Sequence, residues 1–201
     1  MHLNESLHLV LPVRVDDEGN PLIRAYHVPV SREVFELNYR TLAATKARLA
    51  SKGIMYQMDA GPRIAAMVLR DEGKRDAEER GEVNDDGSPR DGGAAALLSE
   101  FKRLTTILAP TQSGWDNLPV DAAIGRGVID AEEWQDTLSA ICFFTCHYAL
   151  ARKSERQRIA EATASLLTGS ITSLDITGLT ASWQTSTPTA TLTVQRSSIP
   201  S

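Results

Sequence analysis

The sequence predicts a mainly α-helical protein: a helical bundle of about five helices, with an N-terminal β-hairpin and an extended Ser/Thr-rich C-terminal tail. Three observations favour this class. Apolar residues recur at helical spacing in several stretches, two β-branched stretches near the start flank a turn-forming cluster, and charged residues are nearly absent after Leu167. We expect a domain over residues 1–167, with a charged flexible loop at about 71–93, and a tail over residues 168–201.

The hairpin is expected from residues 7–15 (LHLVLPVRV) and 22–30 (LIRAYHVPV), which are rich in β-branched residues in partial alternation. Between them the segment DDEGNP contains Gly, Asn and Pro, which favour turns. An isolated hairpin is only marginally stable in water, so we expect it to pack on the helices that follow.

The first helix is expected at about 32–52. Ser31 is a suitable N-cap residue, and Gly53 is a suitable terminator. Phe35, Tyr39, Leu42 and Leu49 fall at i, i+4, i+7 and i+14, which places them on one helical face.

A second helix is expected after Gly61 and Pro62, because proline is favoured in the first helical turn. Its apolar block is followed by a stretch, residues 71–91, in which 13 positions are charged. The first half of that stretch can continue the helix with a solvated face. Residues 81–93 (GEVNDDGSPRDGG) are typical of a flexible loop.

The remaining helices are expected at about 94–108, from Asp130 onward, and at about 154–167. Pro110 ends the first of these, and residues 110–129 are rich in turn formers. Asp130 is followed three residues later by Glu, as in a capping box. The helix it begins is apolar on more than one face, so we expect it at the centre of the fold.

Composition excludes some classes of protein and disfavours others. The 201 residues carry a formal net charge of −5, which disfavours a nucleic-acid partner unless the charge is segregated. The most apolar stretch, residues 138–150, has 13 residues where a membrane span needs about 20. The N-terminus has no secretory signal pattern, so we expect a cytoplasmic protein with reduced thiols.

The two cysteines are expected to be core residues. Cys142, Cys146 and His147 form a C-x3-C-H pattern, in which a helix places the two thiols one turn apart. A structural zinc site needs four ligands, usually from paired clusters. A metal site and a redox role remain as alternatives. We expect no cofactor.

No catalytic motif is present: the chain has no G-x-S-x-G, no G-x-x-x-x-G-K-[ST] and no H-E-x-x-H. The sequence therefore predicts an interaction protein and not an enzyme. A basic cluster, Arg152, Lys153, Arg156 and Arg158, alternates with glutamates. A solvated helix face is the favoured interpretation of this cluster, and a surface for an anionic partner is the alternative.

Five segments of the chain, in order, carry a resemblance to a known family: VPVSREVFELNYRTLAATKARL, AGPRIAAMVLRDE, FKRLTTILAPTQSGWDNLPVDAAIGRGVIDAEEW, ICFFTCHYALARKSER and TSLDITGLTASWQTSTPTAT. Together they resemble the tail assembly chaperones of long-tailed bacteriophages, which are encoded between the tail-tube and tape-measure genes. The likeness covers roughly residues 28–190. The long charged stretch and the hairpin depart from the family pattern.

The resemblance implies a protein that binds the tape-measure protein, keeps it soluble and recruits tail-tube subunits around it. It implies action in the host cell cytoplasm and absence from the mature virion. Self-association is a further expected interaction, and the net charge and the short apolar stretch lead us to expect no nucleic-acid or membrane partner. Such a protein needs apolar faces on which an amphipathic helix can dock, and aromatic residues contribute most to such contacts. The candidate partner-binding residues are Phe35, Tyr39, Trp134, Phe143, Phe144 and, in the tail, Trp183.

Alternatives remain open for the residues and for the function. The five aromatic residues outside the tail can instead be core residues, and the tail can be inert disorder or a strand added to a tube subunit. The runner-up function is a structural subunit of the virion tail or connector, since strand addition between subunits suits ring assemblies. A third is an enzyme that uses Cys142 or Cys146.

Overall fold

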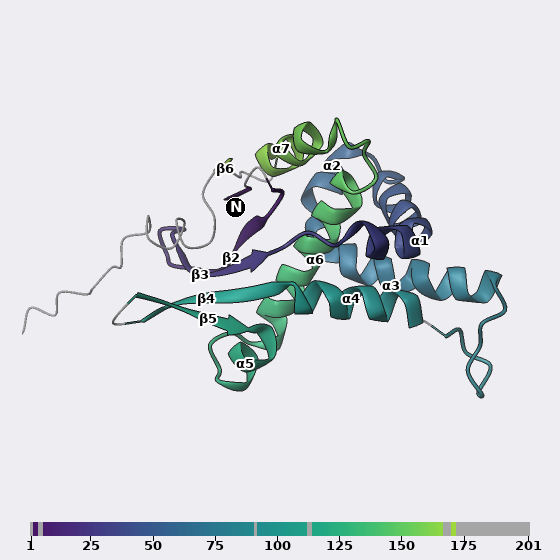
Figure 1. Cartoon of the computed structure of the whole chain (residues 1–201), viewed down its shortest axis with the longest axis horizontal. Coiled ribbons are helices and arrows are strands. Elements are labelled where there is room, and N and C mark those ends of the chain that lie inside the picture. Colours follow the sequence, from purple (N-terminus) through teal and green to yellow (C-terminus); the bar gives the residue numbers. More distant parts are fainter. Residues whose placement is uncertain (1, 4–5, 91, 112–113, 167–169, 172–201) are drawn as a thin grey trace, which may run out of the picture.

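The computed structural model describes residues 2–3, 6–90, 92–111, 114–166 and 170–171. Helices pack on one face of a mostly antiparallel sheet, and the long helix α6 runs through the middle of the molecule (Figure 1). In chain order the elements are β1 (His2–Leu3), β2 (Leu9–Val15), β3 (Pro21–His27), α1 (Arg32–Ala50), α2 (Ile54–Asp59), α3 (Gly61–Glu79), α4 (Gly92–Arg103), β4 (Thr105–Thr111), β5 (Gly114–Pro119), α5 (Val120–Gly125), α6 (Ala131–Tyr148), α7 (Arg156–Leu166) and β6 (Ser170–Ile171).

The sheet has the strand order β5-β4-β3-β2-β1-β6. Strands β2 to β5 pair antiparallel, and the two-residue strands β1 and β6 pair parallel with each other. The predicted hairpin is confirmed: Leu9 pairs with His27 and Val15 with Pro21, across a turn in which Gly19 has a φ of 83°. Strand β3 of the hairpin also pairs with β4, so the hairpin lies in the middle of a larger sheet.

The prediction of a mainly α-helical bundle is wrong, because the sheet extends beyond the hairpin. The helix expected at 94–108 ends at Arg103, and Thr105–Thr111 is strand β4. The turn-rich stretch 110–129 contributes β5 and the short helix α5. A short apolar run such as TTILAPT cannot be assigned to helix or strand by periodicity alone. Its strand conformation depends on pairing with β3, a partner far away in the sequence.

The first half of the charged stretch continues helix α3 to Glu79, as the sequence allowed, so the loop expected at about 71–93 is confined to the residues after α3. Three residues of this part of the helix are buried, Glu72, Gly73 and Ala77, so it has an inward face. The loop that follows is exposed and closes with a bridge between Val83 and Pro89. The first helix, α1, ends two residues before the predicted boundary, and α2 was not predicted.

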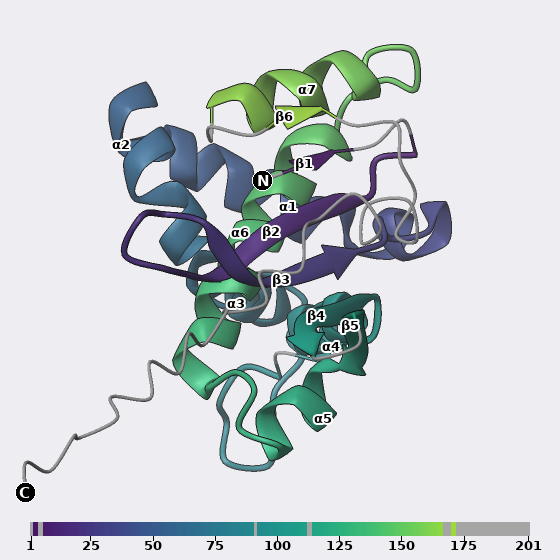
Figure 2. The ribbon, with the colours of Figure 1, turned by 90° about the vertical axis from the view of Figure 1, so that its left-hand side faces the viewer.

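Helix α6 is the central helix, as expected from its apolar character. Its capping box is present: Glu133 N donates to Asp130 Oδ1 at 2.8 Å, and Asp130 N donates to Glu133 Oε2 at 2.9 Å. Arg14 on β2 donates two hydrogen bonds to the same Glu133 carboxylate, at 2.6 and 2.7 Å, which ties the sheet to the start of α6. Figure 2 shows α6 passing behind β2 and β3, and residues of β2 pack against it.

The sheet has an apolar layer on each face. Alternate residues such as Leu9, Leu11 and Ile107 join the main core with the helices, whereas Val10, Tyr26 and Leu108 form a second buried cluster. This two-sided burial explains why the strands alternate only partially in polarity. The fifth predicted helix is confirmed as α7, two residues shorter at its start than expected.

The predicted tail over residues 168–201 lies outside the described residues, except for Ser170 and Ile171 in β6. Within the described ranges, no helix combines the length and the apolarity that a membrane span requires.

Candidate functional site

A groove between α1 and α3 is an extended surface depression lined by described residues. The two helices are antiparallel, since Arg48 lies opposite Glu72 and Arg40 lies opposite Asp76 and Glu79. Two adjoining pockets of about 440 and 110 Å³ share part of their lining and together form the groove. It is lined by Arg40, Thr41, Ala44, Ala47, Arg48, Ser51, Lys52, Glu72, Arg75, Asp76 and Glu79.

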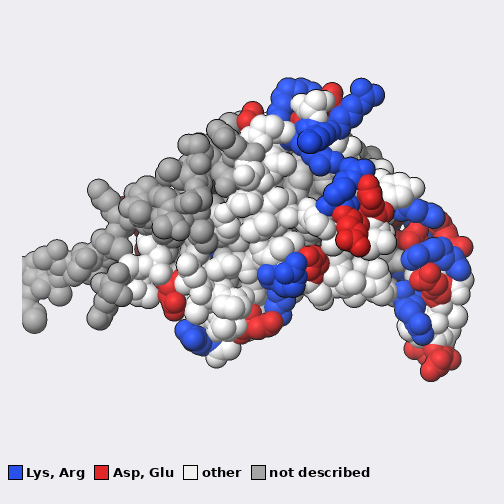
Figure 3. Space-filling view, viewed as in Figure 1, with Lys and Arg blue, Asp and Glu red and all other residues white. Residues whose placement is uncertain are grey.

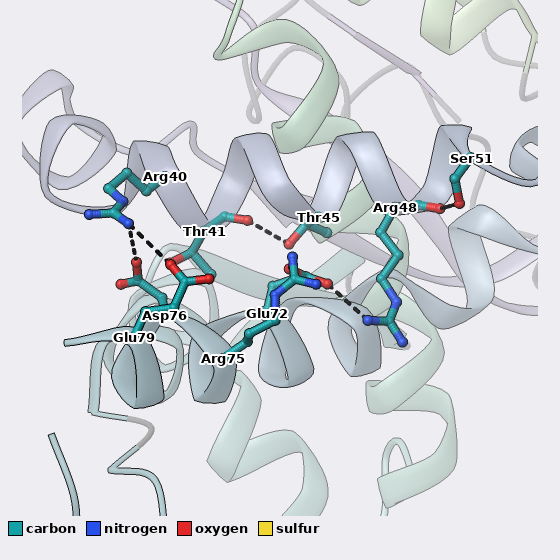
Figure 4. A network of polar contacts seen from close by, with 9 residues as sticks. All are labelled: Arg40, Thr41, Thr45, Arg48, Ser51, Glu72, Arg75, Asp76 and Glu79. Atoms are coloured by element: carbon teal, nitrogen blue, oxygen red, sulfur yellow. Dashed lines mark hydrogen bonds and ion pairs between the residues drawn. The ribbon is translucent and has the colours of Figure 1, made fainter. Parts of the chain in front are cut away.

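A buried carboxylate organises this groove. The Glu72 side chain is 1% exposed, and Arg48 Nη1 and Arg75 Nη2 bind its two oxygens at 3.1 and 2.5 Å (Figure 4). A buried carboxylate is costly unless it is paired and hydrogen-bonded. Both guanidinium groups reach Glu72 from the solvent side, because each arginine side chain remains more than half exposed.

The charge along the groove is uneven. Near α2, Arg48 and Arg75 share the single carboxylate of Glu72, and Lys52 adds another cation, so positive charge is in excess. At the other end, Arg40 lies 3.3 Å from Asp76 and 3.5 Å from Glu79, and Arg80 lies 3.0 Å from Asp76, so the opposite charges balance. A partner helix that lies along the groove therefore meets excess positive charge only at the end near α2.

Helix α2 presents a short apolar surface where the groove ends at Ser51 and Lys52. Ile54, Met55 and Tyr56 are consecutive, and their exposed fractions are 69%, 81% and 45%. Large apolar side chains scattered singly on a surface are ordinary, but three in succession on one short helix indicate an interaction site. We call these three residues the α2 apolar patch.

A hydrogen bond between α2 and α6 fixes the position of the α2 apolar patch. Gln57, on the inner side of α2, lies with its Nε2 2.7 Å from Nε2 of His147 on α6. Nδ1 of His147 lies 2.6 Å from the carbonyl oxygen of Phe143, so Nδ1 carries the proton and Nε2 accepts from Gln57. Burial lowers the pKa of His147, which maintains this neutral tautomer. α3 begins directly after α2 at Gly61, where an added Cβ would lie 2.6 Å from the Phe143 ring.

The structure does not bring the predicted partner-binding residues together. Trp134, Phe143 and Phe144 are core residues, exposed by at most 5%. Phe35 is half-buried and lies under the Arg32 guanidinium, and Tyr39 is 54% exposed on α1. The sixth residue, Trp183, lies outside the described part of the chain.

The cysteines are core residues, as predicted. Cys142 and Cys146 are fully buried free thiols. Burial raises the pKa of Cys142 well above its ordinary value and that of Cys146 to about 12. Thiols in this state are poor nucleophiles. Across the described ranges, no group of three or more His, Cys, Asp or Glu side chains is arranged to hold a metal ion.

Sequence reasoning missed both the groove and the α2 apolar patch. Residues 54–56 (IMY) stand between Gly53 and Gly61 without helical periodicity, so the only available signal was an apolar triplet in a short connection. The groove has no local signal, since its two walls are 20 or more residues apart in the sequence. Comparisons of the chain with protein-family models, with curated proteins and with solved structures find no match.

Proposed function

We propose that the protein is a phage tail assembly chaperone that binds the tape-measure protein and keeps it soluble before the tail tube assembles around it. The observation that carries this proposal is the resemblance of five ordered segments, over roughly residues 28–190, to that family. Under this proposal the protein acts in the host cell cytoplasm and is absent from the mature virion. The tail-tube protein and further copies of the chain are its other proposed partners.

The α2 apolar patch and the groove between α1 and α3 support the proposal by offering a surface for a helical client. A tape-measure protein is expected to expose long amphipathic helices before assembly. One such helix can place apolar residues against Met55 and Tyr56, with acidic residues toward Arg48, Lys52 and Arg75. This is recognition of a helix in a groove, in which apolar anchors provide affinity and flanking charges provide orientation.

The test is co-expression of the chain with the tape-measure protein from the same phage, with the soluble fraction of the tape-measure protein as the measurement. We expect the wild-type chain to raise that fraction. The double substitution Ile54→Ser and Met55→Ser should abolish the increase, because it removes exposed apolar side chains that make little contribution to the core.

A matched control exists on the β2–β3 hairpin, where Val15 and Leu22 are 49% and 44% exposed. Their double substitution by serine should leave the solubilising effect intact. If the wild-type chain itself fails to raise the soluble fraction, the proposed function is wrong. If both double variants behave like the wild type, the function stands but the α2 apolar patch is not its docking surface.

The structural-subunit alternative is separated by mass spectrometry of purified virions. A chaperone should be absent or present in trace amounts, whereas a tail or connector subunit should be recovered in stoichiometric amounts.

A further inference from the structure

A small pocket at the start of α1 lies apart from the groove. Its volume is about 40 Å³, and a cavity needs roughly 10–15 Å³ to hold one water. It therefore has room for one small ion or one terminal group, not for an extended ligand. Its lining comes from the segment before α1, the first turn of α1, the end of α6 and the start of α7: Val30, Ser31, Arg32, Phe35, Tyr148, Ala149 and Arg156.

Two guanidinium groups from opposite ends of the chain line this pocket. Nε of Arg32 donates to Glu36 at 2.6 Å, and Nε of Arg156 donates to the carbonyl oxygen of Ala151 at 3.2 Å. These bonds leave the terminal nitrogens of both groups as donors. Three further basic residues nearby are exposed: Arg152, Lys153 and Arg158. Figure 3 shows Lys and Arg side chains gathered over the start of α7.

The first turn of α1 contributes to the same pocket. Ser31 caps the helix by accepting from Val34 N at 3.3 Å, so the first N–H groups, those of Arg32 and Glu33, have no acceptor within the helix. The positive end of the helix dipole therefore favours an anion here. Glu33 and Glu36 are the nearby carboxylates on α1, and Glu36 already binds Arg32.

A buried hydroxyl without a partner points to a ligand at this position. Tyr148 is 5% exposed and lines the pocket, and its hydroxyl has no hydrogen-bond partner among the described residues. The Thr145 hydroxyl is close enough to act on the Tyr148 pKa, and it too has no partner in hydrogen-bonding geometry among the described residues. Burial raises the pKa of Tyr148, and Arg156 is near enough to oppose that rise. The phenol is therefore a neutral donor, and an unsatisfied buried donor is costly.

We propose that this pocket binds a single oxyanion group, a carboxylate or a phosphate, between Arg32, Arg156 and the Tyr148 hydroxyl. Two cations, one neutral donor and the N–H groups of a helix start are the donor set that such a group requires. The site is independent of the proposed chaperone function and uses none of the residues of the groove. It assigns a role to part of the basic cluster at the start of α7.

The test is a titration of the full chain with inorganic phosphate and, separately, with acetate, at constant ionic strength set by sodium chloride. Amide chemical shifts around Ser31 and Tyr148 are the readout. We expect saturable shifts with at least one of the two anions and none with chloride. Saturation by phosphate alone would identify a phosphate ligand, and saturation by acetate would extend the site to carboxylates. The absence of saturable shifts with either anion would overturn the proposal.

Three variants establish which groups bind. Tyr148→Phe should bind about tenfold more weakly, since a hydrogen bond to a charged group is lost, while its melting temperature without anion stays at the wild-type value. Arg156→Gln should weaken binding by a similar factor. Arg158→Gln, which removes the same charge from an exposed residue outside the pocket, is the control and should bind as the wild type does. If Tyr148→Phe lowers the melting temperature but leaves binding unchanged, the hydroxyl has an internal partner and the proposal fails.

Discussion

Acid should destabilise this fold through one buried histidine, His27, at the end of β3. The residue is 2% exposed and packs edge-on against the Phe101 ring, with ring centroids 5.8 Å apart. Its Nδ1 lies 2.9 Å from the Thr105 hydroxyl oxygen, and that hydroxyl donates its only proton to the carbonyl oxygen of Phe101 at 2.6 Å. Nδ1 must therefore carry the proton of the neutral ring. Nε2 is buried and has no hydrogen-bond partner among the described residues.

Protonation of Nε2 would place an N–H donor and a charge in the core with nothing to accept them. Burial accordingly lowers the pKa of His27 from 6.5 to about 3, with a smaller contribution from neighbouring His8. Because the pKa is lower in the folded state, the unfolded chain binds more protons between these two values, and stability falls as the pH drops below 6.5. The loss is about 1.4 kcal/mol per pH unit, or about 3 kcal/mol between pH 7.5 and pH 4.5.

The perturbation that isolates this effect is His27→Leu, since Thr105 keeps its hydrogen bond to Phe101 when the imidazole is removed. Urea unfolding of both proteins at pH 7.5 and pH 4.5 measures the free energy of unfolding. His8 and His147 also have lowered pKa values. The free energy of unfolding of the wild type should therefore fall by more than His27 alone contributes. Between the two pH values, the free energy of unfolding of the variant should fall by about 3 kcal/mol less than that of the wild type. Equal losses in both proteins would refute the assignment of His27 as the acid-sensitive group.

Three other predictions concern the central helix and its neighbours. Gly61→Ala should lower the free energy of unfolding by about 1–3 kcal/mol, because the new Cβ overlaps the fully buried Phe143 ring. Chemical denaturation measures this change, and an unchanged midpoint would contradict the close approach of Gly61 to Phe143. Asp130→Ala removes the α6 cap and should lower the free energy of unfolding by about 1 kcal/mol, measured in the same way. A decrease of less than a few tenths of a kcal/mol would show that the cap is dispensable. Cys142 and Cys146 should not react with a thiol reagent in the native protein, whereas both should react after denaturation; rapid native labelling would show that the core opens.

Local sequence chemistry determined several elements of this protein. Ser31 begins α1 and Asp130 begins α6, because cap residues satisfy helix N–H groups by contacts within three positions. The hairpin followed from a turn cluster between two β-branched runs, and the burial of Cys142 and Cys146 followed from the apolar helix that carries them. Each of these features depends on neighbours in the chain, so the pattern of residues was sufficient.

Tertiary contacts decided the rest. Residues 105–111 are a strand because the edge of β3 pairs with them across about 80 positions of sequence, and the same run suits a helix when read alone. Glu72 belongs to a charged stretch that looks fully solvated, yet it is buried because Arg48 reaches it from the neighbouring helix. The α2 apolar patch and the pocket beside Tyr148 likewise exist only where distant segments meet. Sequence by itself determined which residues cap, turn and bury locally, whereas the sheet, the groove and both candidate sites depend on partners that no local pattern specifies.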